Sequence, residues 1–214
     1  MKPEKIYLAT TTEGCATNLM ENATYRKTLE LSHIENVQTA EEASVIVINT
    51  CAYTTDQEER SLSVIQKFQE QFPNKQVVVG GCLTKINSKK LSEIYSGETF
   101  TPGNIEQFKK SLKIENNIKA EDVESHFFDK NDFIDLSWKH KLILYFRPIF
   151  YKAEKLFGKK FQPIHNVLKT AIINEEYYGI SVSQGCAGAC TFCSIKMAKG
   201  HVKSKSVVQV MHEF

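Results

Sequence analysis

Short runs of β-branched and aliphatic residues alternate with longer amphipathic segments in the first half of the chain. The runs are Lys5–Thr10, Ser44–Asn49 and Gln76–Gly80, and each has the length and composition of a buried strand. Segments with helical periodicity follow them, over residues 18–31, 56–71, 88–95 and, after a Pro-Gly turn, 105–112. This alternation predicts right-handed βαβ units and therefore an α/β fold with an open parallel sheet.

The second half of the chain has a different organisation. Pro148 and Pro163 interrupt what would otherwise be helical runs. We therefore predict a linker with one or two amphipathic helices, followed by a strand at Tyr178–Ser183 and a helix at Ser206–Phe214 that form one βα unit. The predicted parts are an N-terminal α/β domain at 1–115, a helical linker at 116–175 and the beginning of another α/β domain at 176–214.

Composition narrows the class of protein. The 214 residues are 42% hydrophobic and 24% charged, which is typical of a globular protein with a core. The chain starts without the apolar stretch of a signal peptide, and its longest apolar run, Leu142–Phe146, is too short for a membrane span. We therefore expect a cytoplasmic protein, in which cysteines serve metal binding or catalysis rather than disulfides.

The net charge of +2 conceals a strongly basic stretch at residues 138–160. Seven basic side chains and one acidic side chain, Glu154, are interleaved there with six aromatic residues. Such a stretch could bind nucleic acid or an anionic surface. It could equally be an amphipathic helix pair with buried aromatics and solvated lysines, and the sequence leaves both interpretations open.

Three cysteines near the C-terminus have a spacing with chemical meaning. Cys186, Cys190 and Cys193 form a C-x3-C-x2-C motif directly after the predicted strand. Three thiolates on one loop can hold three corners of an iron–sulfur cluster and leave the fourth iron open. The alternatives are half of a zinc site, although no further Cys or His pair follows the motif, and a structural thiol knot. Just beyond it, Lys196, Lys199 and His201 could meet a carboxylate or phosphate, or lie on a solvated face.

The other three cysteines each follow one of the predicted strands. Cys15, Cys51 and Cys82 should therefore meet at the carboxyl edge of the sheet, where ligand sites of open α/β sheets lie. Gly14 beside Cys15, and Gly80 and Gly81 before Cys82, would permit the close backbone approach of a bulky cluster. Asn18 and Asp56 are placed to cap the following helices. The simplest ligand is a second iron–sulfur cluster with one iron that lacks a protein thiol.

These motifs resemble those of the radical S-adenosylmethionine methylthiotransferases. The resemblance rests on the segments 14–21, 49–51 and 80–83 together with the Cys186 loop, and Glu21 stands where an aspartate is usual. The closest pattern is the archaeal and eukaryotic branch that acts on threonylcarbamoyladenosine in tRNA. The cue is Ser183–Cys186 followed by Ser194–Gly200, because the branches that act on isopentenyladenosine tRNA or on a ribosomal protein usually carry proline where Lys196 stands.

The resemblance implies two 4Fe-4S clusters with different tasks. Cys186, Cys190 and Cys193 would bind the cluster that coordinates and cleaves S-adenosylmethionine, and Cys15, Cys51 and Cys82 the auxiliary cluster that delivers a methylated sulfur. The product would be a 2-methylthio adenosine beside the anticodon. The implied partners are tRNA and an electron-donor protein.

Only 21 residues follow Cys193, whereas the family builds a partial β/α barrel after this motif. We therefore expect a chain that stops after the first βα unit of the radical domain and is inactive alone. It would be a fragment, a truncated gene product, or one half of a split enzyme that pairs with a separate C-terminal half. Two other hypotheses stay open. One is a non-catalytic iron–sulfur module, and the other is a zinc protein that binds nucleic acid through residues 138–160.

Overall fold

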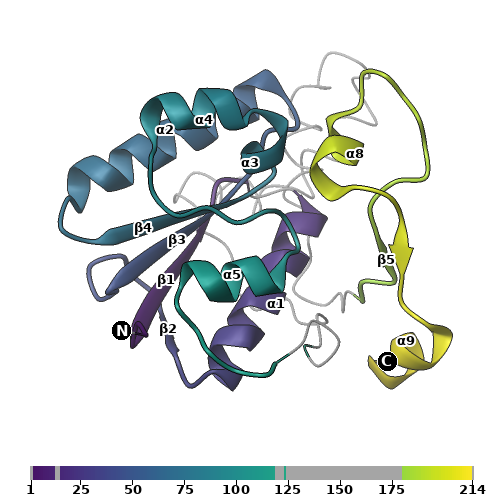
Figure 1. Ribbon diagram of the computed structural model, residues 1–214, viewed down its shortest axis with the longest axis horizontal. Coiled ribbons are helices and arrows are strands. Elements are labelled where there is room, and N and C mark those ends of the chain that lie inside the picture. The colour runs from purple at the N-terminus through teal and green to yellow at the C-terminus, as the bar shows by residue number, and fades with distance from the viewer. Residues whose placement is uncertain (1, 13–14, 119–122, 124–179, 214) are drawn as a thin grey trace, which may run out of the picture.

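A four-stranded parallel sheet forms the centre of the N-terminal domain in the computed structural model (Figure 1), which describes residues 2–12, 15–118, 123 and 180–213. Its strands are β1 (Lys5–Thr10), β2 (Glu35–Val37), β3 (Val45–Thr50) and β4 (Gln76–Gly81). They are ordered β2-β1-β3-β4, and every neighbouring pair is parallel. The α/β fold with a parallel sheet is thus confirmed.

Helices cover both faces of this sheet. They are α1 (Ala16–Leu31), α2 (Thr55–Gln71), α3 (Leu83–Ile86), α4 (Ser88–Ile94) and α5 (Ile105–Ser111). Because side chains alternate along a strand, β3 contributes Val45 and Val47 to one core cluster and Ile46 and Ile48 to the other. The first cluster includes residues of α1 and α5, and the second includes residues of α2 and α4, so the domain has three layers.

In the N-terminal domain the predicted strands and helices differ from the observed ones by no more than two residues at any end, but two short elements were not predicted. β2 has three residues and α3 has four, too few for a periodic pattern. The predicted strand at Tyr178–Ser183 was wrong over residues 180–182, which are not in a strand, and β5 (Ser183–Gln184) is limited to two residues. The predicted helix caps were wrong. Cys15 occupies the N-cap position of α1, and Thr54 caps α2 by accepting a hydrogen bond from the Gln57 N–H.

The C-terminal segment lies beside α3 at the edge of the domain (yellow-green in Figure 1). Strand β5 (Ser183–Gln184) pairs antiparallel with β6 (Lys203–Ser204), and α8 (Ser194–Lys199) lies between them in the chain. Neither α8 nor this pairing was predicted, whereas α9 (Val207–Glu213) matches the predicted terminal helix. Helix α8 packs against α3, which brings the two cysteine-bearing parts of the chain together.

The predicted linker at 116–175 and its basic stretch at 138–160 lie almost entirely outside the described residues, so both stay predictions, as do the domain boundaries. In the part of the chain that the structure describes, none of the helices is long and apolar enough to cross a lipid bilayer.

Candidate functional site: two groups of three cysteines

Cys15, Cys51 and Cys82 lie at the carboxyl edge of the sheet, after β1, β3 and β4. Cys51 and Cys82 are buried, with 4% and 7% of their surface exposed, and Cys15 is half-buried. Burial raises the pKa of Cys51 and raises that of Cys82 to about 11. A negative charge on Cys15 raises the pKa of Cys51 and of Cys82 further. A negative charge on Cys51 also raises the pKa of Cys82. Because β1, β3 and β4 are neighbours in the sheet, the three cysteines follow adjacent strands at one edge, as the strand pattern predicted.

Two buried hydroxyl groups fix the backbone of Cys51. Its N–H lies 3.0 Å from Oγ1 of Thr11 and 3.2 Å from Oγ of Ser61, and the Ser61 hydroxyl donates to the Cys51 carbonyl at 2.6 Å. The Thr11 and Ser61 hydroxyls are 2.8 Å apart. Because Thr11 follows β1, Cys51 follows β3 and Ser61 belongs to α2, the position of Cys51 depends on three separate elements of the domain. Neither hydroxyl residue had been singled out from the sequence.

Thr50 fixes the turn that carries Cys82. Its carbonyl accepts from the Cys82 N–H at 2.9 Å, and its hydroxyl donates to the Gly80 carbonyl at 2.5 Å. Asn18 donates from Nδ2 to the Thr50 carbonyl at 3.2 Å, and its Oδ1 lies 3.9 Å from Sγ of Cys82. Asn18 is thus a fully buried support of the thiol edge rather than a helix cap.

A second pair of asparagines extends this polar layer. Nδ2 of Asn49 donates to Oδ1 of Asn22 at 2.8 Å, and both side chains are buried. Asn18 and Asn22 stand four residues apart on α1, on one face of the helix. That spacing, with Asn49 two residues before Cys51, is the sequence signal that could have identified the layer.

The two glycines before Cys82 serve a purpose different from the predicted one. A Cβ on Gly80 would lie 2.0 Å from the Phe100 ring. Gly81 has a φ of +90°, and a Cβ there would lie 2.3 Å from the Thr50 carbonyl oxygen. The missing side chains of these glycines therefore leave space for the Phe100 ring and the Thr50 carbonyl group. This corrects the expectation that the glycines make room for a cluster. Gly14 lies outside the described residues.

The C-terminal cysteines occupy a short and more open loop. Cys186 and Cys193 are half-buried and Cys190 is exposed. A Cβ on Gly188 would lie 3.4 Å from Sγ of Cys186 and 3.8 Å from Sγ of Cys190, so these two thiols flank the same residue. The Gly188 N–H lies 3.3 Å from Sγ of Cys186, and Lys196 donates to the Gly188 carbonyl at 2.5 Å. Cys193 occupies the N-cap position of α8.

Among the described residues, which include all six cysteines, no three His, Cys, Asp or Glu side chains are arranged to hold a metal ion. The chemistry of the two donor sets nevertheless fits iron–sulfur clusters, because each offers three thiols without a competing histidine or carboxylate ligand set. The first set is largely shielded from water, and the second has a backbone N–H directed at one sulfur. The assignment of ligands stays a prediction.

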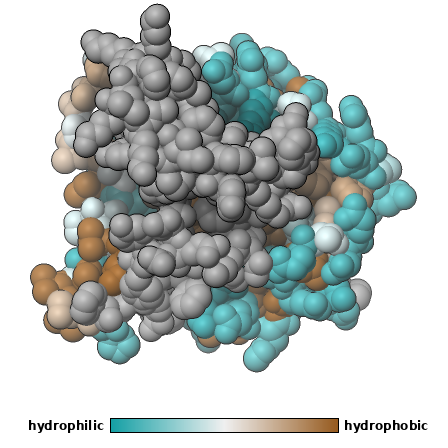
Figure 2. Space-filling view, turned by 180° about the vertical axis from the view of Figure 1, so that it is seen from behind, coloured by the Kyte–Doolittle hydropathy of each residue, from teal (hydrophilic) through white to brown (hydrophobic). Residues whose placement is uncertain are grey.

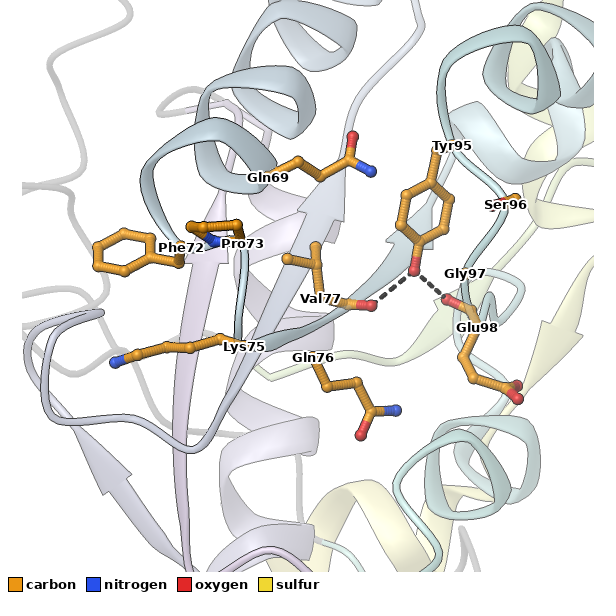
Figure 3. Close-up of a pocket in the computed structure, with 10 residues that line it drawn as sticks. All are labelled: Gln69, Phe72, Pro73, Lys75, Gln76, Val77, Tyr95, Ser96, Gly97 and Glu98. Carbon is orange, nitrogen blue, oxygen red and sulfur yellow. Dashed lines mark hydrogen bonds between the residues drawn. The ribbon is translucent and has the colours of Figure 1, made fainter.

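A pocket of about 480 Å³ lies at the opposite, amino edge of the sheet (Figure 3). It is lined by residues of the α2–β4 connection and by the segment after α4, where Tyr95 lies. The Tyr95 hydroxyl lies 2.6 Å from the Val77 carbonyl oxygen and 2.9 Å from that of Glu98. Burial raises the pKa of Tyr95, so its hydroxyl stays protonated and holds the loop. We assign this pocket no chemistry.

Comparison with known proteins agrees with the cysteine pattern. Residues 6–101 match the model of "Uncharacterized protein family UPF0004". The chain is 25% identical over 203 residues to the ribosomal protein uS12 methylthiotransferase RimO of Bdellovibrio bacteriovorus, covering 94% of this chain and 38% of the relative. It is 25% identical over 210 residues to the probable threonylcarbamoyladenosine tRNA methylthiotransferase of Archaeoglobus fulgidus, covering 96% and 40%.

A third relative carries a third substrate name. The tRNA-2-methylthio-N(6)-dimethylallyladenosine synthase of Buchnera aphidicola is 24% identical over 226 residues, covering all of this chain and 42% of the relative. The chain therefore spans about two fifths of the length of these curated relatives. Residues 6–101 thus match the UPF0004 family model, and nearly the whole chain is similar in sequence to the first two fifths or so of proteins named methylthiotransferases.

Proposed function

We propose that this chain supplies the two cysteine sites of a radical S-adenosylmethionine methylthiotransferase. The observation that carries the proposal is the position of Cys15, Cys51 and Cys82 after three adjacent strands at one sheet edge, with the C-terminal cysteine segment packed beside this edge through α8 and α3. Methylthiolation needs one site that generates a radical and one that donates sulfur, and two three-thiol sites match that need. The names of the relatives support the same reaction.

The two sites would divide the work. When bound, the clusters and S-adenosylmethionine would supply reductive cleavage of the cofactor and a transferable methylated sulfur. Cys15, Cys51 and Cys82 would hold the auxiliary 4Fe-4S cluster, while Thr11, Ser61 and Thr50 keep the backbone at its ligands in place. Cys186, Cys190 and Cys193 would hold the other 4Fe-4S cluster, and the Gly188 N–H would stabilise the charge of the Cys186 thiolate.

The substrate we propose is threonylcarbamoyladenosine in tRNA. Support comes from the Ser183–Cys186 and Ser194–Gly200 segments and from relatives of that name in Archaeoglobus fulgidus and Pyrococcus horikoshii, the latter 26% identical. Relatives that carry the uS12 and dimethylallyladenosine names are equally similar, so those substrates are the competing ones. The partners would be tRNA and an electron donor, in the cytoplasm.

The distribution of apolar surface supports a larger assembly. Among the described residues, eight large apolar side chains in the C-terminal segment are exposed, from Val182 and Phe192 to Val207, Val208 and Met211 of α9. Figure 2 shows hydrophobic atoms at its lower left, where α9 lies after the half-turn from Figure 1. A further part of the enzyme would cover this surface.

Cluster chemistry is tested by anaerobic reconstitution of the chain with iron and sulfide. We expect addition of S-adenosylmethionine to change the EPR spectrum of the reduced chain, and Cys186→Ala to abolish that change. Stoichiometric zinc without iron would contradict the proposal and favour the zinc hypothesis. Clusters whose EPR spectrum does not change on addition of S-adenosylmethionine would favour the hypothesis of a non-catalytic iron–sulfur module.

The substrate is tested by mass spectrometry of modified nucleosides and peptides. The chain is incubated alone, and together with the remaining part of the Pyrococcus horikoshii relative, with three substrates: tRNA with threonylcarbamoyladenosine, tRNA with dimethylallyladenosine, and protein uS12. We expect a methylthio group only in the completed reaction and only on threonylcarbamoyladenosine. Product on either other substrate would contradict the substrate proposal, and product from the chain alone would contradict its expected dependence on a further part.

A further inference from the structure

A buried ion pair connects the two cysteine-bearing parts of the chain. Nζ of Lys199 at the end of α8 lies 2.7 Å from Oε1 of Glu21 in α1, 178 positions away in the sequence. Each side chain has only 6% of its surface exposed. Removing two charges from water is expensive, and replacing such a pair by apolar residues is often neutral or stabilising. Stability alone therefore gives little reason for charges at this place.

The surroundings place this pair at the N-terminal cysteine site. Oδ1 of Asn18 lies 3.4 Å from Nζ of Lys199 and 3.9 Å from Sγ of Cys82, so one amide oxygen contacts both groups. On the other side, Nε2 of Gln184 in β5 donates to Oε1 of Glu21 at 2.9 Å. Residues just before and just after the Cys186 loop thus meet on the same carboxylate.

The charges at this junction are incompletely balanced. Oε2 of Glu21 has no hydrogen-bond partner although it is buried. Burial raises the pKa of Glu21, and Lys199 and Gln184 act in the opposite direction. The positive charge of Lys199 also counteracts the raised pKa values of Cys51 and Cys82. Its field therefore reaches the thiols of the first site as well as its partner carboxylate.

We propose that Lys199 is a positioning residue that couples the two cysteine sites: paired with Glu21, it docks the Cys186 loop on the sheet edge and places a positive charge beside Cys82. The docking rests on the described contacts alone. The effect of the charge on a cluster rests on the proposed function. A cation beside a cluster favours its more negative, reduced form, so Lys199 should raise the reduction potential of the N-terminal cluster.

Docking is tested in the metal-free chain by hydrogen exchange of the backbone amides at 186–200. Lys199→Met and Glu21→Gln should each speed exchange there by about tenfold or more, because each leaves an unpaired buried group. The double variant should exchange more slowly than the product of the two single effects predicts, because it leaves no isolated charge. Lys203→Met is the matched control, since Lys203 is exposed on the same segment, and it should change nothing. Unchanged exchange in Lys199→Met would overturn the proposal.

The charge effect is tested on the N-terminal cluster alone, in the variant Cys186→Ala/Cys190→Ala/Cys193→Ala. EPR-monitored redox titration should give a lower midpoint potential for Lys199→Met, and little change for Lys199→Arg or Lys203→Met. Glu21→Gln breaks the same pair but keeps the cation, so a purely structural role would shift the potential in the same direction in Glu21→Gln as in Lys199→Met, whereas the charge effect lowers it only in Lys199→Met. Equal potentials of the parent and Lys199→Met would overturn the coupling. A chain that takes up no iron would contradict the proposed function instead, and the exchange experiment would then decide the role of Lys199.

Discussion

The two cysteine sites of this chain are built in opposite ways. Cys51 and Cys82 are buried, and their backbone is held by hydroxyl and carbonyl groups from several elements of the N-terminal domain. Cys190 is exposed, and the loop around it is held mainly by its own backbone and by Lys196. A site whose ligands belong to separate strands depends on the folded sheet, whereas a site within eight consecutive residues does not. The first should therefore respond to changes in the core of the domain, and the second only to changes at its docking contacts with Glu21.

Glycine substitutions should separate the two sites most strongly. Gly80→Ala would place a methyl group 2.0 Å from the Phe100 ring in the core, and overpacking of this kind should lower the free energy of unfolding by about 3 kcal/mol or more. Gly188→Ala meets only the thiols at 3.4 and 3.8 Å, which is ordinary contact, and should change it by about 0.5 kcal/mol at most. Urea unfolding measures both, and equal effects would contradict the comparison.

Serine substitutions should give a smaller difference in the same direction. Ser61→Ala removes the buried hydroxyl that contacts Thr11 and both backbone groups of Cys51, and should cost about 2 kcal/mol of unfolding free energy. Ser194→Ala is the matched control, because its hydroxyl makes one hydrogen bond of 3.5 Å to the Tyr53 carbonyl. Thermal unfolding followed by circular dichroism tests this. A Ser61→Ala protein as stable as the parent would show that Cys51 is not fixed as described.

Thiol alkylation of the metal-free, reduced chain should follow exposure. At pH 8 iodoacetamide should modify Cys190 first, and Cys82 at least about tenfold more slowly, because Cys82 is buried and only its thiolate reacts. Burial raises the pKa of Cys82 to about 11, so its modification should keep accelerating as the pH rises toward that value. Peptide mass spectrometry gives both rates. Modification of Cys82 as fast as that of Cys190 would mean that the N-terminal site is open.

The smallest effect should come from an ion pair remote from both sites. Nζ of Lys90 lies 2.8 Å from Oε1 of Glu58 on the surface, and Lys90 and Asn87 lower the pKa of Glu58. A lowered pKa means that the folded state favours the carboxylate. The resulting stabilisation is present above pH 4.5, the ordinary value, and is lost as the pH falls through the lowered pKa.

In Glu58→Gln the free energy of unfolding should therefore decrease slightly less than in the parent as the pH falls below 4.5. Both cysteine sites should stay unchanged. Urea unfolding between pH 3 and pH 7 measures this difference. A large loss at neutral pH would show that this half-buried pair matters as much as the buried Glu21–Lys199 pair.

The sheet was predictable because its strands are short and apolar on both faces. Val45 to Ile48 are all buried. A continuous β-branched run of that kind is typical of a strand that is buried on both faces of a parallel sheet. The gathering of Cys15, Cys51 and Cys82 followed from strand direction alone. The supports of the site were harder to predict: the spacing of Asn18 and Asn22 is a local signal for the polar layer, but Thr11 and Ser61 act through tertiary contacts that no local pattern encodes.

Local rules failed where tertiary packing decided the outcome. Asn18 has good capping chemistry, yet it lies inside the first turn of α1 and supports Thr50 instead. Gly80 was interpreted through the expected cluster, whereas the Phe100 ring occupies the space beside it. From the sequence, Lys199 could contact a carboxylate or phosphate, or lie on a solvated face. Only the position of α8 against the domain identifies Glu21 as its partner.

The central claim is that the chain holds two separate three-thiol cluster sites, and iron counting after anaerobic reconstitution tests it most directly. The parent chain should bind roughly eight irons with equal sulfide. Cys15→Ala/Cys51→Ala/Cys82→Ala and Cys186→Ala/Cys190→Ala/Cys193→Ala should each retain roughly four. A parent chain with roughly four irons, or one triple variant that retains the full complement, would contradict the account.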